Sequence, residues 1–306
     1  MNPAQSLRAL LVFPGLLYAL PMGWLMLGTE RKLRARFQGR IGPPITQPFW
    51  DLIKLLAKSP VARVISDRGL LAGLPLLAVA SMLGALALLP VFAGENGFPG
   101  DLVLLVGLLE LPPLCLILAG YASRSIYGEL GATREAIVSI ASNVPFLAAL
   151  VAMATAAGSL HLSAIAVATP WPVRVPALIA ILLCLPVKLR INPVSLANAE
   201  QEVLAGPLTE FDGRLLAFWE LAHVLEWVAL TGFVVTILVP LRNSLGMLDA
   251  VVFALISLAL VPLLTLLGAA TARLKLAQAT RLLWRWAGAA AAIALILSMG
   301  IRHGGY

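Results

Sequence analysis

The chain has 306 residues, of which 60% are hydrophobic and only 12% charged, and its mean hydropathy is +0.94. A soluble globule, in which about a quarter of the residues are charged, could not cover so much apolar surface, so the composition excludes a soluble domain and indicates a membrane protein. The formal charge of +7 predicts no nucleic-acid partner, because the cations fall in alternate connections between apolar segments.

Eight apolar segments follow one another along the chain, each near the ~20 residues that cross a bilayer. They cover 6–27, 69–92, 101–122, 136–158, 173–190, 215–240, 249–270 and 286–301. The sequence therefore predicts an all-α polytopic protein of about eight transmembrane helices, with one membrane domain over 1–306. The first segment is too long for the apolar part of a signal peptide and lacks a small-residue cleavage site, so we expect it to stay in the mature protein.

Basic residues concentrate in four connections. Of the 22 Lys and Arg, 18 lie in 28–68, 123–135, 188–214 and 271–285. By the positive-inside rule, these connections are predicted to be cytoplasmic and both termini to lie outside.

The first connection contains a short amphipathic segment at 47–58. Asp51, Lys54 and Lys58 share one face at helical spacing, and apolar side chains share another. The segment is too short to span a bilayer, so we predict a helix lying along the cytoplasmic interface.

Metal-binding residues are sparse. Cys115 and Cys184 lie in separate apolar segments, and the three histidines are scattered. We therefore predict no disulfide framework, no metal site and no cofactor in this chain.

Ionisable residues inside the apolar segments are costly and usually face an interior cavity. Glu220, His223 and Glu226 recur every third residue, so they occupy a sector of about 120° on one helix. They predict a buried polar relay, unless Glu220 and His223 lie in the headgroup region. Glu110 stands beside two prolines and is predicted to point into the bundle as a further relay residue.

Three motifs carry a family resemblance. They are residues 30–44 followed by 51–56, then 131–136 after the third apolar segment, and 198–213. Together they resemble the NADH dehydrogenase subunit 1 family of complex I over essentially the whole chain, and the last two motifs are most similar to its branch of membrane anchors in energy-converting nickel–iron hydrogenases.

The resemblance implies a non-catalytic subunit in the cytoplasmic membrane of a bacterium or archaeon. Its expected partners are a hydrogenase large subunit, an Fe–S small subunit and antiporter-like membrane subunits, besides the lipid bilayer. The Ni–Fe centre and the iron–sulfur clusters are expected in those partners.

The charged residues of the first two motifs are the predicted docking surface for these partners. They are Glu30, Arg31, Arg34, Arg36, Arg40, Asp51, Lys54, Arg134 and Glu135. Arginine forks suit carboxylate and backbone acceptors, and Gly39, Gly42 and two prolines specify a loop shape. The alternative is anchoring to lipid headgroups by snorkelling cations.

The third motif carries four acids, Glu200, Glu202, Glu210 and Asp212. Like charges this close should raise some of the carboxyl pKa values toward the working pH, which suits a proton-conducting funnel. The alternative is an acidic loop in solvent.

Some carboxylates of the family's lateral proton path are absent here. Asn143, Lys188, Ser195 and Asn198 stand where the family often has acids, and Ile191 where it has a basic residue. Lys188 would add a positive barrier unless burial neutralises it. Whether ions are pumped, and which, therefore stays open. Two other functions also stay open: a quinone-site subunit of a complex I-type oxidoreductase, and a stand-alone ion transporter.

Overall fold

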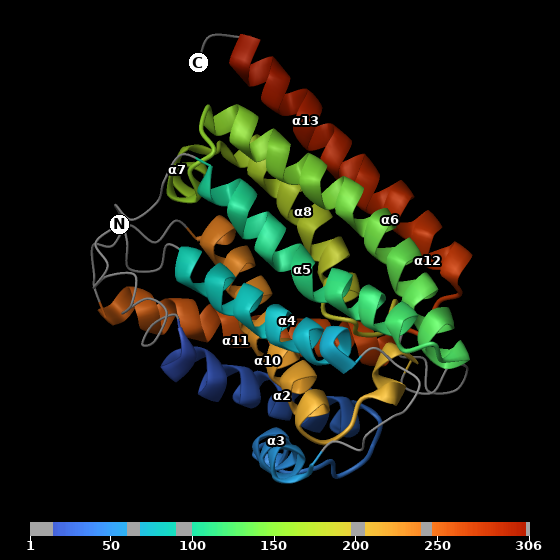
Figure 1. Ribbon diagram of the computed structural model, residues 1–306. Helices are drawn as coiled ribbons and strands as arrows, with labels where there is room; N and C mark the ends of the chain where they lie inside the picture. The colour runs from blue at the N-terminus through green and yellow to red at the C-terminus, as the bar shows by residue number, and fades with distance from the viewer. Residues whose placement is uncertain (1–14, 60–67, 90–99, 197–205, 240–246, 304–306) are drawn as a thin grey trace.

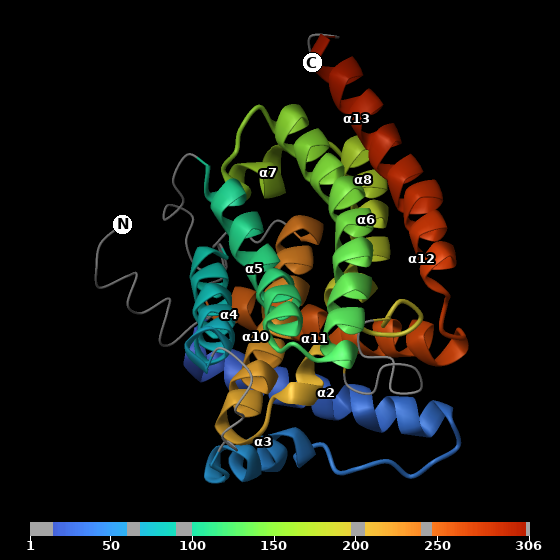
Figure 2. The same ribbon diagram turned by 45° about the vertical axis from the view of Figure 1, so that its right-hand side comes forward.

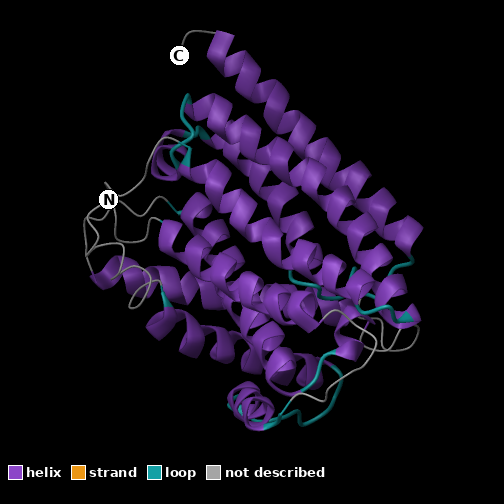
Figure 3. Ribbon diagram, viewed as in Figure 1, coloured by secondary structure: helices purple, strands orange, loops and turns teal. Residues whose placement is uncertain are grey.

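The computed structural model describes residues 15–59, 68–89, 100–196, 206–239 and 247–303 (Figure 1). Within these ranges every regular element is helical and no strand occurs (Figure 3). The predicted all-α fold is therefore confirmed.

The helices are α2 (Leu16–Phe37), α3 (Gln47–Ala57), α4 (Arg68–Leu88), α5 (Asp101–Ala122), α6 (Ile126–Ala157), α7 (Leu162–Ala168), α8 (Trp171–Lys188), α10 (Gly213–Leu238), α11 (Met247–Ala270), α12 (Leu276–Leu282) and α13 (Gly288–His303). A 3₁₀ turn, η1 (Gly206–Glu210), precedes α10, and a π-helical segment, η2 (Leu283–Ala287), joins α12 to α13.

Seven helical stretches in the described ranges are long and apolar enough to cross a membrane, and they correspond to the last seven predicted segments. The first predicted segment, 6–27, is described only from residue 15, where it forms part of α2. The count of eight therefore rests on the sequence for that segment.

Helix α10 lies at the centre of the bundle. In the most apolar stretch of α10, 83% of the residues are buried, compared with 28% in the stretch formed by α12, η2 and α13. A helix that is apolar all round belongs in a core. Helix α2 approaches α10 closely at Gly23. Only glycine fits at this position, because a Cβ there would overlap Val224 of α10. Helices α6, α8 and α13 pack on one another at the edge of the bundle (Figures 1 and 2).

The four basic connections meet at one end of the bundle. Arg214 Nε donates to the Leu56 carbonyl oxygen at 3.3 Å, and the Leu274 N–H donates to the Pro193 oxygen at 2.9 Å. A Cβ on Gly120, at the end of α5, would lie 3.3 Å from Pro207. Figure 2 shows α3 at this end, beneath α2. The alternation deduced from charge is thus realised in the fold.

Three of those connections contain more helix than predicted. Helix α2 runs on to Phe37, so most of the basic patch is helical, and α6 already begins at Ile126. The expectation that the whole connection 123–135 forms a loop is wrong, because 126–135 is helical. Its charged residues lower the hydropathy without breaking the helix, and Gly128 packs against Ser123 and Gly120, which brings the turn close to α5. Helix α12 and η2 likewise occupy 276–287.

The predicted amphipathic helix is confirmed as α3. An ion pair between Arg31 and Asp51 at 2.9 Å and an edge-on contact of Phe49 with Trp24 attach it to α2. Leu52 is buried, whereas Trp50 remains 58% exposed. One flank therefore packs on the bundle while another apolar flank faces outward, as in an interfacial helix.

We predict that Gly28→Ala destabilises the fold. A Cβ at Gly28 of α2 would clash with the carbonyl oxygen of Ile45, which is backbone and cannot easily move. Overpacking of this kind costs about 1–3 kcal/mol, so thermal unfolding of the full chain in detergent should have a lower midpoint. Gly73→Ala in α4 is the control, because nothing lies within 4 Å of its Cβ position. Equal midpoints for the two variants would contradict the prediction.

Candidate functional site

A buried cluster formed by Arg190, His223, Glu226 and Trp227, called here the Glu226 cluster, joins the end of α8 to α10. Arg190 forms an ion pair and hydrogen bond with Glu226, and its Nη2 lies 3.0 Å from His223 Nδ1. The Glu226 side chain is 1% exposed and that of Arg190 12%. The guanidinium therefore compensates a carboxylate that burial would otherwise make very costly.

His223 has two donor-only neighbours. Trp227 Nε1 donates to His223 Nε2 at 3.2 Å, and Arg190 Nη2 lies 3.0 Å from Nδ1. Nδ1 also lies 3.2 Å from Glu226 Oε2. His223 and Glu226, predicted from their spacing as relay partners, are in direct contact. Trp227 contacts the other ring nitrogen of His223, so the imidazole is held between Trp227 and Glu226.

Arg190 is a site residue that the sequence did not predict. It follows the last turn of α8 with φ +53°, and the Ile191 N–H reaches back to the Pro186 oxygen at 2.9 Å. This helix ending usually takes glycine, because a side chain in the left-handed region costs about 1–2 kcal/mol. The left-handed turn aims the guanidinium at Glu226. A cation as the last residue of the predicted apolar segment 173–190 was the available signal.

A second buried cluster, the Glu110 cluster, joins α5, α6 and α8 through Glu110, Asn143 and Lys188. Lys188 forms an ion pair with Glu110 and donates to Asn143 Oδ1 at 2.9 Å. Asn143 Nδ2 in turn donates to Glu110 Oε2 at 2.8 Å. Every contact in this ring of three joins a donor to an acceptor, so the amide orientation is consistent with both charges.

The Glu110 cluster shows how the positive charge of Lys188 is accommodated inside the bundle. Its ammonium, with a side chain only 4% exposed, is compensated by Glu110 and lies 4.4 Å from the centroid of the Phe146 ring. It is therefore not an isolated positive barrier. Glu110 points into the bundle, as predicted from the prolines beside it.

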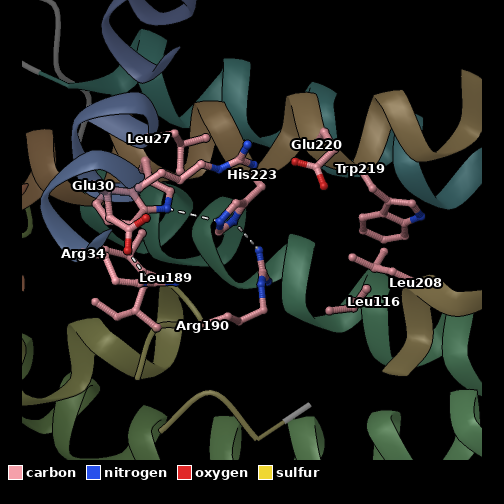
Figure 4. A pocket seen from close by; sticks show the side chains of 13 residues that line it. Leu27, Glu30, Arg34, Leu116, Leu189, Arg190, Leu208, Trp219, Glu220 and His223 are labelled. Atoms are coloured by element: carbon pink, nitrogen blue, oxygen red, sulfur yellow. Dashed lines mark hydrogen bonds and ion pairs between the residues drawn. The ribbon is translucent and has the colours of Figure 1, made fainter. Parts of the chain in front are cut away.

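A polar cavity of about 250 Å³ lies against the Glu226 cluster (Figure 4). Its walls include Glu30, Arg34, Arg190, Glu220 and His223, and in Figure 4 Arg190 reaches toward His223 from the opposite wall. Glu30 is paired with Arg34, and burial raises the pKa of Glu30 despite the opposing effect of that arginine. The cavity thus brings groups that can exchange protons next to a buried ion pair.

The predicted acidic funnel is only partly described. Glu200 and Glu202 lie outside the described residues, as does Asn198. Glu210 ends η1, and Asp212 directly precedes α10. Since Leu208 of η1 lines the cavity, this turn forms part of the cavity wall.

The predicted docking residues separate into three groups. Arg36, Arg40 and Lys54 are exposed. Arg31, Asp51 and the half-buried Arg134 take part in contacts within the chain. Arg34 lines the cavity with Glu30, which is buried, as is Glu135. Glu30 and Glu135 thus lie inside the isolated chain, and docking through the residues of this set stays a prediction.

No group of three or more metal-ligating side chains converges within the described residues.

Comparison with known proteins gives concordant matches. The family model described as NADH dehydrogenase matches residues 9–299. Hydrogenase-4 component C of Escherichia coli (strain K12) is 32% identical over 228 residues, which cover 72% of this chain and 72% of that protein. Formate hydrogenlyase subunit 4 of the same strain is 30% identical over 274 residues, covering 85% and 89%.

A complex I subunit and a solved structure extend the comparison. NADH-quinone oxidoreductase subunit 8 of Thermus thermophilus is 30% identical over 256 residues, covering 76% of this chain and 68% of that one. A chain in the structure of the membrane-bound sulfane sulfur reductase, an archaeal respiratory membrane complex, superposes with a TM-score of 0.83 at 27% identity, covering 96% and 99%.

We predict that Lys188→Met destabilises the full chain and that adding Glu110→Gln largely restores it. Alone, the first change leaves a carboxylate in the bundle without its cation, at a cost of roughly 3 kcal/mol, the lower end of the range because Glu110 keeps some exposure. The double variant removes both charges and should unfold within about 1 kcal/mol of the original chain. Unfolding of the four proteins in detergent gives the coupling energy. If the losses of stability in the two single variants simply add in the double variant, the ion pair is contradicted.

Proposed function

The chain belongs to the NADH dehydrogenase subunit 1 family, and on this premise we propose that it is the membrane-anchor subunit of a hydrogenase-like respiratory complex. In this proposal its cytoplasmic end docks a Ni–Fe subunit and an Fe–S subunit, and the ionisable residues behind that end conduct protons. The main observation in support is that two features lie next to each other. The basic connections meet at one end of the bundle, and the polar cavity with both ion-pair clusters lies close behind them.

The exposed part of the first connection supports docking. Arg40 follows the end of α2, where its N–H donates to the Ala35 oxygen at 2.8 Å and folds the chain back. Gly42 adopts φ +75° and lies so close to Ala35 that a Cβ would overlap it. Arg36 and Arg40 form no ion pair with another described residue, so their guanidinium groups are available for acceptors on a partner.

Proton conduction is supported by the order of groups from that end inward. Glu30 and Glu220 line the cavity, His223 joins the cavity to Glu226, and Glu110 lies in a second buried cluster. Each can bind or release a proton, and deep ionisable groups in membrane helices mark ion pathways. The Ni–Fe centre and the iron–sulfur clusters belong to the partners in this proposal, as do the antiporter-like membrane subunits beside the chain.

The docking part predicts that Arg36→Glu with Arg40→Glu releases the hydrophilic partners. Reversing two exposed cations replaces attraction by repulsion without touching a buried pair. The readout is the set of chains that copurify with the tagged protein from mild detergent, together with the amount inserted in the membrane. Arg281→Glu on α12 is the control, because it is also exposed and lies at the same end. An intact complex in the double variant would count against docking through this loop.

The conduction part predicts that Glu226→Gln uncouples turnover from proton movement. The change keeps the shape of the side chain but removes the charge that holds Arg190 and contacts Nδ1 of His223. Proton translocation by the complex in proteoliposomes should fall about tenfold or more, while reduction of methyl viologen by the hydrophilic partners with H₂ continues. Unchanged translocation would reduce Glu226 to a packing role.

A further inference from the structure

Glu135 occupies an unexpected position on α6. Its side chain belongs to a motif predicted to form a docking loop, yet it is only 6% exposed and lies inside the bundle. The adjacent residues explain the burial. Gly131 and Ala132 are buried, and Gly120 of α5 packs directly against Ala132. This close contact turns the face that bears Glu135 inward.

The charged neighbours of Glu135 come from both buried clusters. They are Arg190, Glu226 and Lys188, which lie close enough to Glu135 to interact with it electrostatically. Asn143 of the Glu110 cluster lies eight residues further along α6, about two helical turns away. Glu135 therefore stands between the Glu226 cluster and the Glu110 cluster.

Charge counting distinguishes Glu135 from its neighbours. The two clusters and Glu135 together hold three carboxyl groups but only two side chains with a fixed positive charge. Lys188 is paired with Glu110 and Arg190 with Glu226, whereas Glu135 makes no hydrogen bond to another described side chain. A ring nitrogen of His223 accepts from Trp227, so the imidazole is neutral in this arrangement and supplies no third charge. A third buried carboxylate without its own cation is costly.

Among the described residues, the other elements packed on α6 do not correct this imbalance. Residues 271–303 contain no acid; the cations Lys275, Arg281 and Arg285 are exposed, and Arg273 is half-buried ahead of α12. Helix α7 carries no charge, and η1 carries no cation. A single proton on one of the three carboxyl groups makes the assembly neutral.

We propose that Glu135 carries this exchangeable proton and forms the proton-binding site between the two ion-pair clusters. This inference rests on the conduction part of the proposed function and deepens it. One proton from the cavity side forms an O–H bond on the Glu135 carboxylate. The same bond breaks when the proton passes toward the Glu110 cluster. No electron is transferred. The net charge of the three carboxyl groups and the two cations alternates between zero and −1.

Infrared difference spectroscopy of the full chain in lipid nanodiscs tests the site itself. Spectra are compared between mildly acidic and mildly alkaline buffer for the original chain, Glu135→Gln, Glu135→Asp and Glu129→Gln. Glu129 is the matched control, because it lies on the same helix but is exposed. We expect a carboxyl C=O band from a non-aqueous environment that is absent in Glu135→Gln, shifted in Glu135→Asp and unchanged in Glu129→Gln. A Glu135→Gln spectrum identical to the original would overturn the proposal.

Proton translocation by the complex in proteoliposomes, measured for the same variants, separates the two hypotheses. We expect Glu135→Gln to lose most of the translocation, Glu135→Asp to restore part of it and Glu129→Gln to retain it. If the original complex turns over without moving protons while the Glu135 band still titrates, the conduction hypothesis fails and the proton site stands. If translocation survives in Glu135→Gln, Glu135 is not on the path and the proposal is overturned.

Discussion

Charge compensation in a medium that solvates ions poorly is the constraint on which this interior depends. An unpaired charge inside the bundle would cost several kcal/mol, so Lys188 and Arg190 at the end of α8 each meet a carboxylate from another helix. Lys188 of α8 is paired with Glu110 of α5, and Arg190 with Glu226 of α10. The left-handed backbone at Arg190 is the local cost of that second pairing. These pairs join α5, α8 and α10, and α5 and α8 also pack on α6, which carries Glu135.

Docking and conduction are supported by different parts of one end of the molecule. Exposed arginines lie on the outer surface, whereas Arg31 and Arg34, from the same motif, are occupied in attaching α3 and in lining the cavity. Some residues of the basic patch therefore form the outer surface, while others make internal contacts that hold that surface in place. In the proposed function, a partner seated above the cavity would change the charge that the buried carboxyl groups experience.

The sequence predicts the elements better than their contacts. Apolar length identifies the later spans, and amphipathic spacing identifies α3, because both signals are local. The same signals miss the start of α6, where charged residues lower the hydropathy of a continuous helix. The His223–Glu226 contact follows from a spacing of three. The pairing of Lys188 with Glu110, 78 residues away in sequence, and the burial of Glu135 depend on how α5, α6 and α8 pack, which no local pattern encodes.

The composition of the native complex tests most directly whether this chain is a hydrogenase anchor. A tag on the chain, mild solubilisation of the source membranes, mass spectrometry of the copurifying chains and elemental analysis for nickel and iron would suffice. We expect two hydrophilic partners with nickel and iron, together with further membrane subunits. Copurification of an NADH-oxidising flavoprotein with quinone-dependent activity, or isolation of the chain alone with transport in liposomes and no iron–sulfur partner, would contradict the assignment.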